Sequence, residues 1–163
     1  MNPFDILGRY FWLIALVMSG FNYFATTRKL ESSGVAGPRT TPEARSLRLW
    51  FAAVAAVPWV VMGVGELVGG VPNVFSYFRP QDGNPYVLAW YGAVFMITLG
   101  FVYWVFVCGG AEKAVELELF PLKSMRGDVK LTPGRVKLFS ALGPVWFALW
   151  VLLVVSMNAP VSK

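Results

Sequence analysis

The sequence predicts an all-α integral membrane protein built as a four-helix bundle. Three observations support this prediction: 56% of the 163 residues are hydrophobic and only 14% are charged, long apolar stretches follow one another, and basic residues gather between alternate stretches. Soluble domains carry about 25% charged residues. The composition and the mean hydropathy of +0.58 therefore exclude an ordinary water-soluble globule.

Four apolar stretches are candidates for membrane spans. A bilayer core about 30 Å thick is crossed by about 20 apolar residues in a helix, which bonds all its own backbone amides. The stretches are residues 10–26, 49–71, 86–110 and 136–157, within a single transmembrane domain over residues 1–163. The first is the shortest and has a signal peptide as its alternative. Asp5 before it, Arg28 and Lys29 directly after it, and the lack of a small-residue cleavage pattern favour an uncleaved helix.

The basic residues predict the orientation. Eleven of the fourteen lysines and arginines lie in or beside two connections, at residues 27–48 and 111–135. Lysine and arginine are retained on the cytoplasmic side of a membrane. We therefore expect both connections in the cytoplasm and both termini outside, most simply in a bacterial inner (plasma) membrane. The net charge of +5 then reflects topology and contact with anionic lipid, and it does not indicate nucleic-acid binding.

Internal matches raise the hypothesis of two repeated transmembrane hairpins. Residues 20–24 (GFNYF) resemble residues 100–104 (GFVYW). Threonine and proline precede both the second and the fourth stretch, and a proline followed by a tryptophan interrupts each at a comparable depth. Two hairpins of the same orientation, related by an axis along the membrane normal, would produce this order. Chance is the alternative, because the offsets between matches vary and aromatic residues are abundant.

Two loop segments have some regular character. Residues 72–85 combine an apolar half, which we expect against the headgroups, with a turn-forming half; a re-entrant segment is the alternative. Residues 111–120 alternate glutamate with apolar residues after the break at Gly109 and Gly110. A short helix and a short strand both fit this pattern.

Glu66 is the acidic residue that falls within a predicted span. An ionisable group inside a membrane is costly and often functional. It lies about 17 residues into its stretch, or roughly 25 Å along a helix, which is close to the outer boundary. The carboxylate could therefore simply reach water there, or it could bind a proton or another cation.

Asn22, Trp59 and Trp146 complete the candidate ligand-binding or ion-binding residues. Pro58 and Pro144 are expected to kink their helices next to the two tryptophans. Buried indole donors need partners, and we expect the carbonyls freed at the kinks and the neighbouring helices to supply them. An apolar-ligand pocket between the hairpins is the alternative.

Small residues predict close helix packing or a surface for another chain. Glycine and alanine allow membrane helices to approach each other closely. The residues concerned are Ala52, Ala56, Gly63, Gly65, Gly69, Ala89 and Ala93.

The sequence offers little for catalysis. It has no histidine, no nucleophile elbow and no phosphate loop, and its one cysteine, Cys108, has no partner thiol. We therefore expect no enzyme, no metal and no cofactor. The predicted function is that of a noncatalytic accessory, assembly or scaffold subunit of a membrane complex or homo-oligomer. A small proton-coupled carrier or apolar-ligand-binding protein that uses Glu66 is the alternative.

Overall fold

The computed structural model describes residues 3–32, 37–119, 123–124, 127–128 and 131–157. Four long helices dominate it: α1 (Pro3–Ser32), α2 (Pro42–Leu67), α3 (Pro85–Phe106) and α5 (Pro133–Met157). Shorter elements join them. These are the 3₁₀ turns η1 (Pro38–Thr40), η2 (Val74–Phe78) and η3 (Pro80–Asp82), the helix α4 (Gly110–Glu116), and the paired two-residue strands β1 (Lys123–Ser124) and β2 (Gly127–Asp128).

Local sequence signals fix where the long helices begin. The Thr41 side chain accepts a hydrogen bond from the Ala44 amide (3.2 Å), and Asn84 accepts one from the Tyr86 amide (2.9 Å). Each cap is followed by a proline in the first helical turn, where a missing amide proton costs nothing. Proline therefore starts α2 and α3 before the apolar stretches expected at 49–71 and 86–110.

Left-handed glycines account for the earlier ends of two predicted spans. Gly70 has φ of +66° and Gly109 has φ of +70°, a backbone region that favours glycine. As a result α2 ends at Leu67 and α3 ends at Phe106, each four residues before the predicted boundary. The short helix α4 starts directly after Gly109, and this resolves the choice left open for this segment in favour of a helix over Gly110–Glu116, while residue 120 lies outside the described residues.

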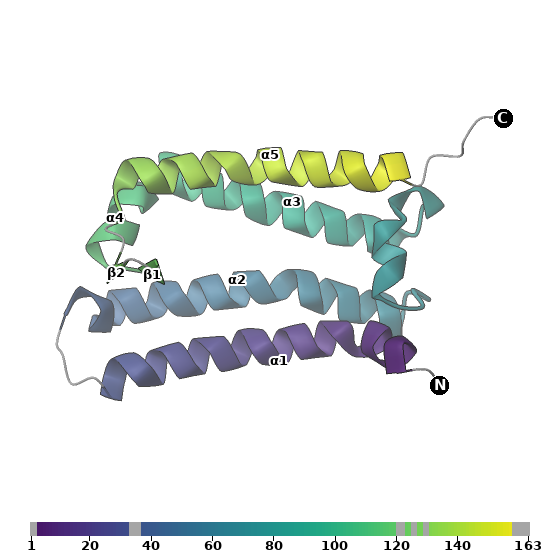
Figure 1. Ribbon diagram of the computed structural model, residues 1–163, viewed down its shortest axis with the longest axis horizontal. Helices are drawn as coiled ribbons and strands as arrows, with labels where there is room; N and C mark the ends of the chain where they lie inside the picture. The colour runs from purple at the N-terminus through teal and green to yellow at the C-terminus, as the bar shows by residue number, and fades with distance from the viewer. Residues whose placement is uncertain (1–2, 33–36, 120–122, 125–126, 129–130, 158–163) are drawn as a thin grey trace.

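The four long helices lie side by side in sequence order, as Figure 1 shows from α1 at the bottom to α5 at the top. Helix α1 packs on α2, α2 on α3, and α3 on α5. Among the described residues no extensive contact joins α1 to α5, so the structure does not confirm a compact bundle. Lipid solvates an apolar helix face about as well as another helix does, so no hydrophobic force closes the row.

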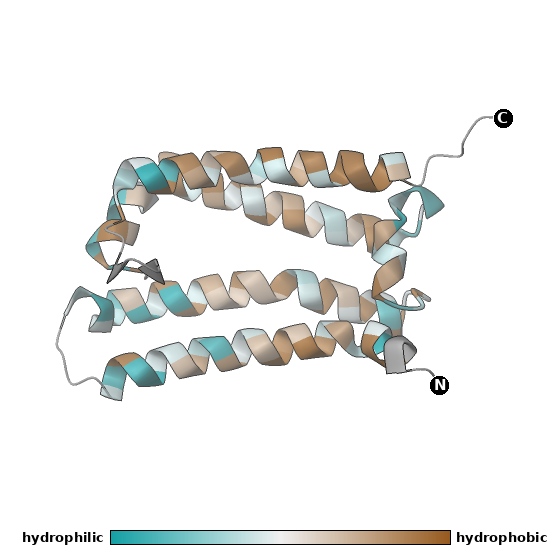
Figure 2. Cartoon of the chain, in the orientation of Figure 1, coloured by the Kyte–Doolittle hydropathy of each residue, from teal (hydrophilic) through white to brown (hydrophobic). Residues whose placement is uncertain are grey.

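Three helices are long and apolar enough to cross a membrane: α2, α3 and α5. This supports a membrane protein, and Figure 2 shows apolar residues along the helices with hydrophilic residues concentrated at the ends. Helix α1 is long but does not meet the same requirement. Its apolar run is shorter because Arg9, Asn22 and Thr26 stand in it or at its borders.

Short elements pack at both ends of the row. At one end, called here the α4 end, α4 buries Ala111 and Ala114 completely against Val105 of α3 and Ala44 of α2. At the other, called the η2 end, η2 buries Tyr77 among residues of α2 and α3. Helix α1 begins and α5 ends at the η2 end (Figure 1).

Candidate functional site

The η2 end carries buried hydrogen bonds and, within the described part of the chain, unpartnered polar side chains. After α2 ends, the chain turns at Gly70, and the Val71 amide bonds back to the Gly65 carbonyl (3.1 Å). The Asn73 side chain then caps η2 by accepting a hydrogen bond from the Phe75 amide (3.0 Å). The segment expected to lie against the headgroups is therefore folded back over the helix ends.

Tyr77 anchors this segment. Its ring is 3% exposed, its hydroxyl donates to the Met62 carbonyl (3.0 Å), and its own carbonyl accepts from the Tyr91 hydroxyl (2.9 Å). Burial raises the pKa of Tyr77 to about 12, and the nearby negative charge of Glu66 adds to this effect. Tyr77 is therefore a neutral hydrogen-bond donor at physiological pH.

Glu66 lies beside Tyr77, at the last turn of α2. Both of its carboxylate oxygens are buried, and neither has a hydrogen-bond partner among the described residues. The Trp90 indole nitrogen is buried and unpartnered in the same sense, and its ring lies 5.7 Å from that of Tyr77. The two oxygens are covered by protein atoms where the chain folds back over the end of α2. A buried charge without donors is unfavourable, so this position calls for a proton, a water or a ligand.

The structure brings only some of the predicted ligand-binding residues together. Trp59 lies two turns before Glu66 on α2. It packs against the apolar cluster that contains Tyr77 and contacts Phe11 of α1 (ring centroids 5.9 Å apart). Asn22 is exposed on α1, and Trp146 is 68% exposed on α5. Trp59 and Trp146 therefore do not form a shared pocket between the hairpins.

The glycines singled out for packing lie against aromatic side chains of this chain. A Cβ atom added at Gly63 would come within 2.7 Å of the Trp12 ring, and one at Gly69 would meet the Tyr86 ring. One at Gly65 would contact the Tyr77 hydroxyl and lie 3.1 Å from the Tyr86 Cβ. These glycines therefore make room for aromatic rings of α1, η2 and α3 to pack directly against the backbone of α2 and the residues that follow it. The alanines of the set differ: Ala52, Ala56 and Ala93 are half-buried, and Ala89 is exposed.

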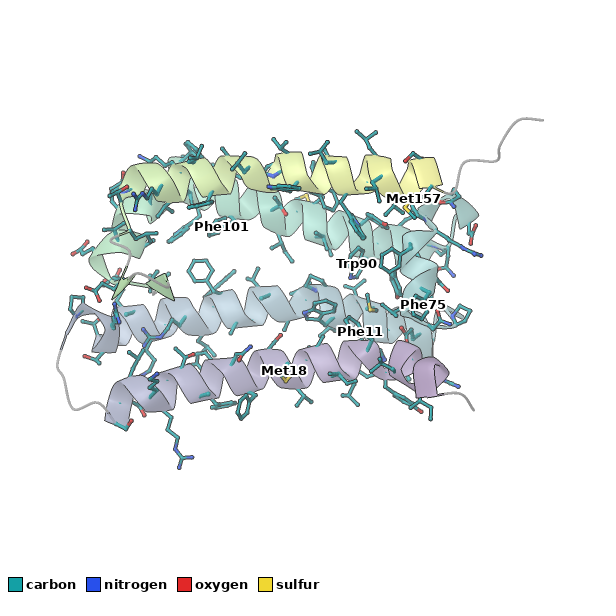
Figure 3. The ribbon with its side chains drawn as sticks, viewed as in Figure 1. Phe11, Met18, Phe75, Trp90, Phe101 and Met157 are labelled. Carbon is teal, nitrogen blue, oxygen red and sulfur yellow. The ribbon has the colours of Figure 1, made fainter. Side chains whose placement is uncertain are left out.

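A cavity of about 530 Å³ opens at the η2 end, beside η2 and η3. Its polar lining comes from Asn73, Ser76, Arg79, Asp82 and Asn84, and its apolar floor from the buried Val71 and Val87. Figure 3 shows Phe75 of η2 and Trp90 of α3 at this end of the molecule. The cavity was not predicted from the sequence, where residues 72–85 indicate only an apolar half and a turn-forming half. The available signal was the pair Arg79 and Asp82, three positions apart where the two halves meet.

The α4 end is held by ion pairs. Lys113 of α4 pairs with Glu43 of α2 (2.9 Å), and Glu112 of α4 pairs with Lys137 of α5 (2.8 Å). The pairing with Lys137 lowers the pKa of Glu112, and the pairing with Glu43 raises the pKa of Lys113. Two further pairs, Arg45–Glu31 and Arg39–Glu118, join the surrounding segments. All four pairs are well exposed, so they fix the geometry more than they stabilise it.

In the part of the chain that the structure describes, no three histidine, cysteine or acidic side chains lie together in a way that could hold a metal ion. Cys108 is exposed beside α4. No known family model, curated protein or solved structure matches the chain. Its function must therefore be argued from its own residues.

Proposed function

We propose that the protein is a noncatalytic membrane subunit that acts by lateral association, with further copies of itself or with another membrane protein. The supporting observation is that the two edge helices of the row, α1 and α5, each expose a hydrogen-bonding side chain. These are Asn22 on α1 and Trp146 on α5.

Both side chains lie well inside the helices that we expect to span the membrane. Asn22 lies inside the expected span 10–26, and Trp146 lies 13 residues, or roughly 20 Å, into α5. Neither side chain hydrogen-bonds to any described residue. In hydrocarbon, such groups favour a hydrogen-bond partner on a neighbouring helix, and each bond formed stabilises helix association by about 0.6 to 2 kcal/mol. A helix of another chain could provide this partner at the two open edges of the row.

The experiment measures assembly mass after extraction in a mild detergent. We expect an assembly larger than one chain for the wild type, and partial dissociation for the double variant Asn22→Leu, Trp146→Phe. Met96→Leu on α3 is the control, because Met96 is 66% exposed but lies on an inner helix of the row. A lone wild-type chain, or an assembly that the double variant leaves intact, would refute the proposal.

We also propose that α1 is a fourth span and that the α4 end faces the cytoplasm of a bacterial inner membrane. The distribution of basic residues supports this orientation, and so does the position of both basic connections at the α4 end (Figure 1). Cys108 provides the test, since it is the one cysteine and is exposed at that end. A membrane-impermeant maleimide should label it in inverted vesicles and not in intact cells. Labelling in intact cells would reverse the orientation.

We propose that the hairpins α1–α2 and α3–α5 arose by duplication. Pro58 lies inside α2 and Pro144 inside α5, and each of these helices begins with a proline that follows a threonine. A relative in which residues matching 20–24 and 100–104 are more alike would support duplication. Relatives that lose the resemblance while keeping the helices would count against it.

A small proton-coupled carrier or ligand-binding protein is the second candidate, and the unpartnered Glu66 carboxylate favours it. In proteoliposomes with an imposed pH gradient, we expect Glu66→Gln to abolish proton flux that the wild type supports. Glu116→Gln is the control, because Glu116 is exposed on α4. Equal flux in the wild type and Glu66→Gln would eliminate the carrier role.

A further inference from the structure

The cavity at the η2 end presents one positive and one negative side chain that do not pair with each other. Arg79 and Asp82 both line it, and both side chains are exposed. Arg79 directly precedes the short turn η3 and Asp82 is its last residue, and the Asp82 amide donates to the Arg79 carbonyl (3.1 Å). Neither side chain forms an ion pair or a side-chain hydrogen bond with any described residue. Both charges are therefore available to a ligand.

A site of this kind selects against simple ions. An anion drawn to Arg79 is repelled by Asp82, and a cation drawn to Asp82 is repelled by Arg79. A molecule that carries both charges a few bonds apart satisfies both side chains at once, and arginine is well suited to a phosphate because it donates from a planar fork. We infer that this cavity binds a zwitterionic phosphate–ammonium group, with the phosphate at Arg79 and the ammonium at Asp82.

The surroundings indicate a lipid as the source of that group. The floor residues Val71 and Val87 lie just beyond the end of α2 and in the first turn of α3, which are two of the three helices able to cross a membrane. The cavity thus lies at the level where these helices leave the hydrocarbon. Phe75 lines the cavity and is 58% exposed, as expected of an aromatic side chain at this level. The headgroup of phosphatidylethanolamine fits this position and this pair of charges.

This inference rests on the proposed membrane insertion of α2 and α3, and it is independent of lateral association. The size of the cavity, about 530 Å³, is within the range of small-molecule sites and leaves room for water around a headgroup. The hydroxyl of Ser76 adds a polar group to the wall.

The experiment measures how much lipid the purified protein retains, by native mass spectrometry in detergent with equal amounts of phosphatidylethanolamine and phosphatidylglycerol. We expect the wild type to retain the first over the second. Arg79→Gln and Asp82→Asn should each weaken that retention about two- to fivefold, the usual scale for one exposed charge pair. Gln81→Ala is the matched control, because Gln81 lies between the two charges in sequence but does not line the cavity.

Two further arms decide the outcome. The exchanged variant Arg79→Asp, Asp82→Arg should regain part of the lost retention, because it restores one charge of each sign. Soluble phosphoethanolamine should compete poorly; if it displaces the lipid at equal concentration, the lipid source is overturned and a free zwitterion takes its place. Equal retention of the two lipids, or unchanged retention in both single variants, would overturn the inference. Retention is scored per chain, so its result stands whether or not the chain assembles.

Discussion

Substitution of Gly65 by alanine tests whether the back-fold at the η2 end is tightly packed. The added Cβ would contact the Tyr77 hydroxyl, lie 3.1 Å from the Tyr86 Cβ and lie 3.4 Å from a Val71 methyl group. The Tyr86 Cβ is fixed to the backbone at the start of α3, so it cannot move away by rotating a side chain. The tyrosine hydroxyl must therefore give way.

The expected cost follows from two effects. Overpacking a filled interior costs about 1–3 kcal/mol. If the Tyr77 hydroxyl moves, its hydrogen bond to the Met62 carbonyl is lost as well, which costs about 1 kcal/mol more. We therefore expect Gly65→Ala to lower the free energy of unfolding by about 2–4 kcal/mol.

The assay is denaturant-induced unfolding in detergent micelles, followed by tryptophan fluorescence. Trp90 reports directly on the region, because its ring lies 5.7 Å from that of Tyr77. Gly92→Ala in α3 is the control, since an added Cβ there meets nothing within 4 Å. Equal stability of the two variants would show that η2 does not pack on α2 in this way.

Three further predictions concern the two ends. The pKa of Tyr77 is raised from its ordinary value of 10.0 to about 12. The stability that the neutral Tyr77 contributes is therefore complete below pH 10 and is lost as the pH rises from 10 to 12. In unfolding titrations, Tyr77→Phe should remove this part of the loss of stability at alkaline pH. The pKa of Glu112 is lowered by its hydrogen bond to Lys137, so its contribution is present above the ordinary carboxyl pKa and is lost as the pH falls through the lowered value. Glu112→Gln should flatten the acid limb of a stability profile, and an unchanged limb would contradict the pairing. Ala114 is fully buried, so Ala114→Leu should lower the free energy of unfolding by about 1–3 kcal/mol. Ala141→Leu is the control, because Ala141 is exposed and its substitution should change stability by about 0.5 kcal/mol at most. Similar unfolding midpoints for the two variants would refute the packing of α4.

The long helices were predictable because their causes are local. Apolar length, a proline after a capping residue, and a glycine after the last turn all act within a few residues of sequence. Three of the four predicted spans are confirmed as helices of sufficient length and apolarity: α2, α3 and α5. Their ends differ from prediction where the caps Thr41 and Asn84 and the turns at Gly70 and Gly109 act before the apolar run starts or stops.

The open row and the folded-back segment were not predictable, because they depend on contacts between distant residues. The pairing of Gly69 with Tyr86 depends on how two helices face each other across a loop, and sequence alone does not give their rotation. The same applies to Glu66. The rise of a helix gives its expected depth, but its burial depends on Tyr77, eleven residues further along the chain, folding back over α2.

The ion pair between Lys113 and Glu43 joins residues 70 positions apart in the chain. Synthesis proceeds from the N-terminus at about 5–20 residues per second, so α1 and α2 emerge seconds before α4 exists. During that interval Glu43 lacks Lys113, the Arg39 side chain lacks Glu118, and Ala44 has nothing from α4 to cover it. The packing of the first hairpin at this end is therefore completed only after α4 has been made.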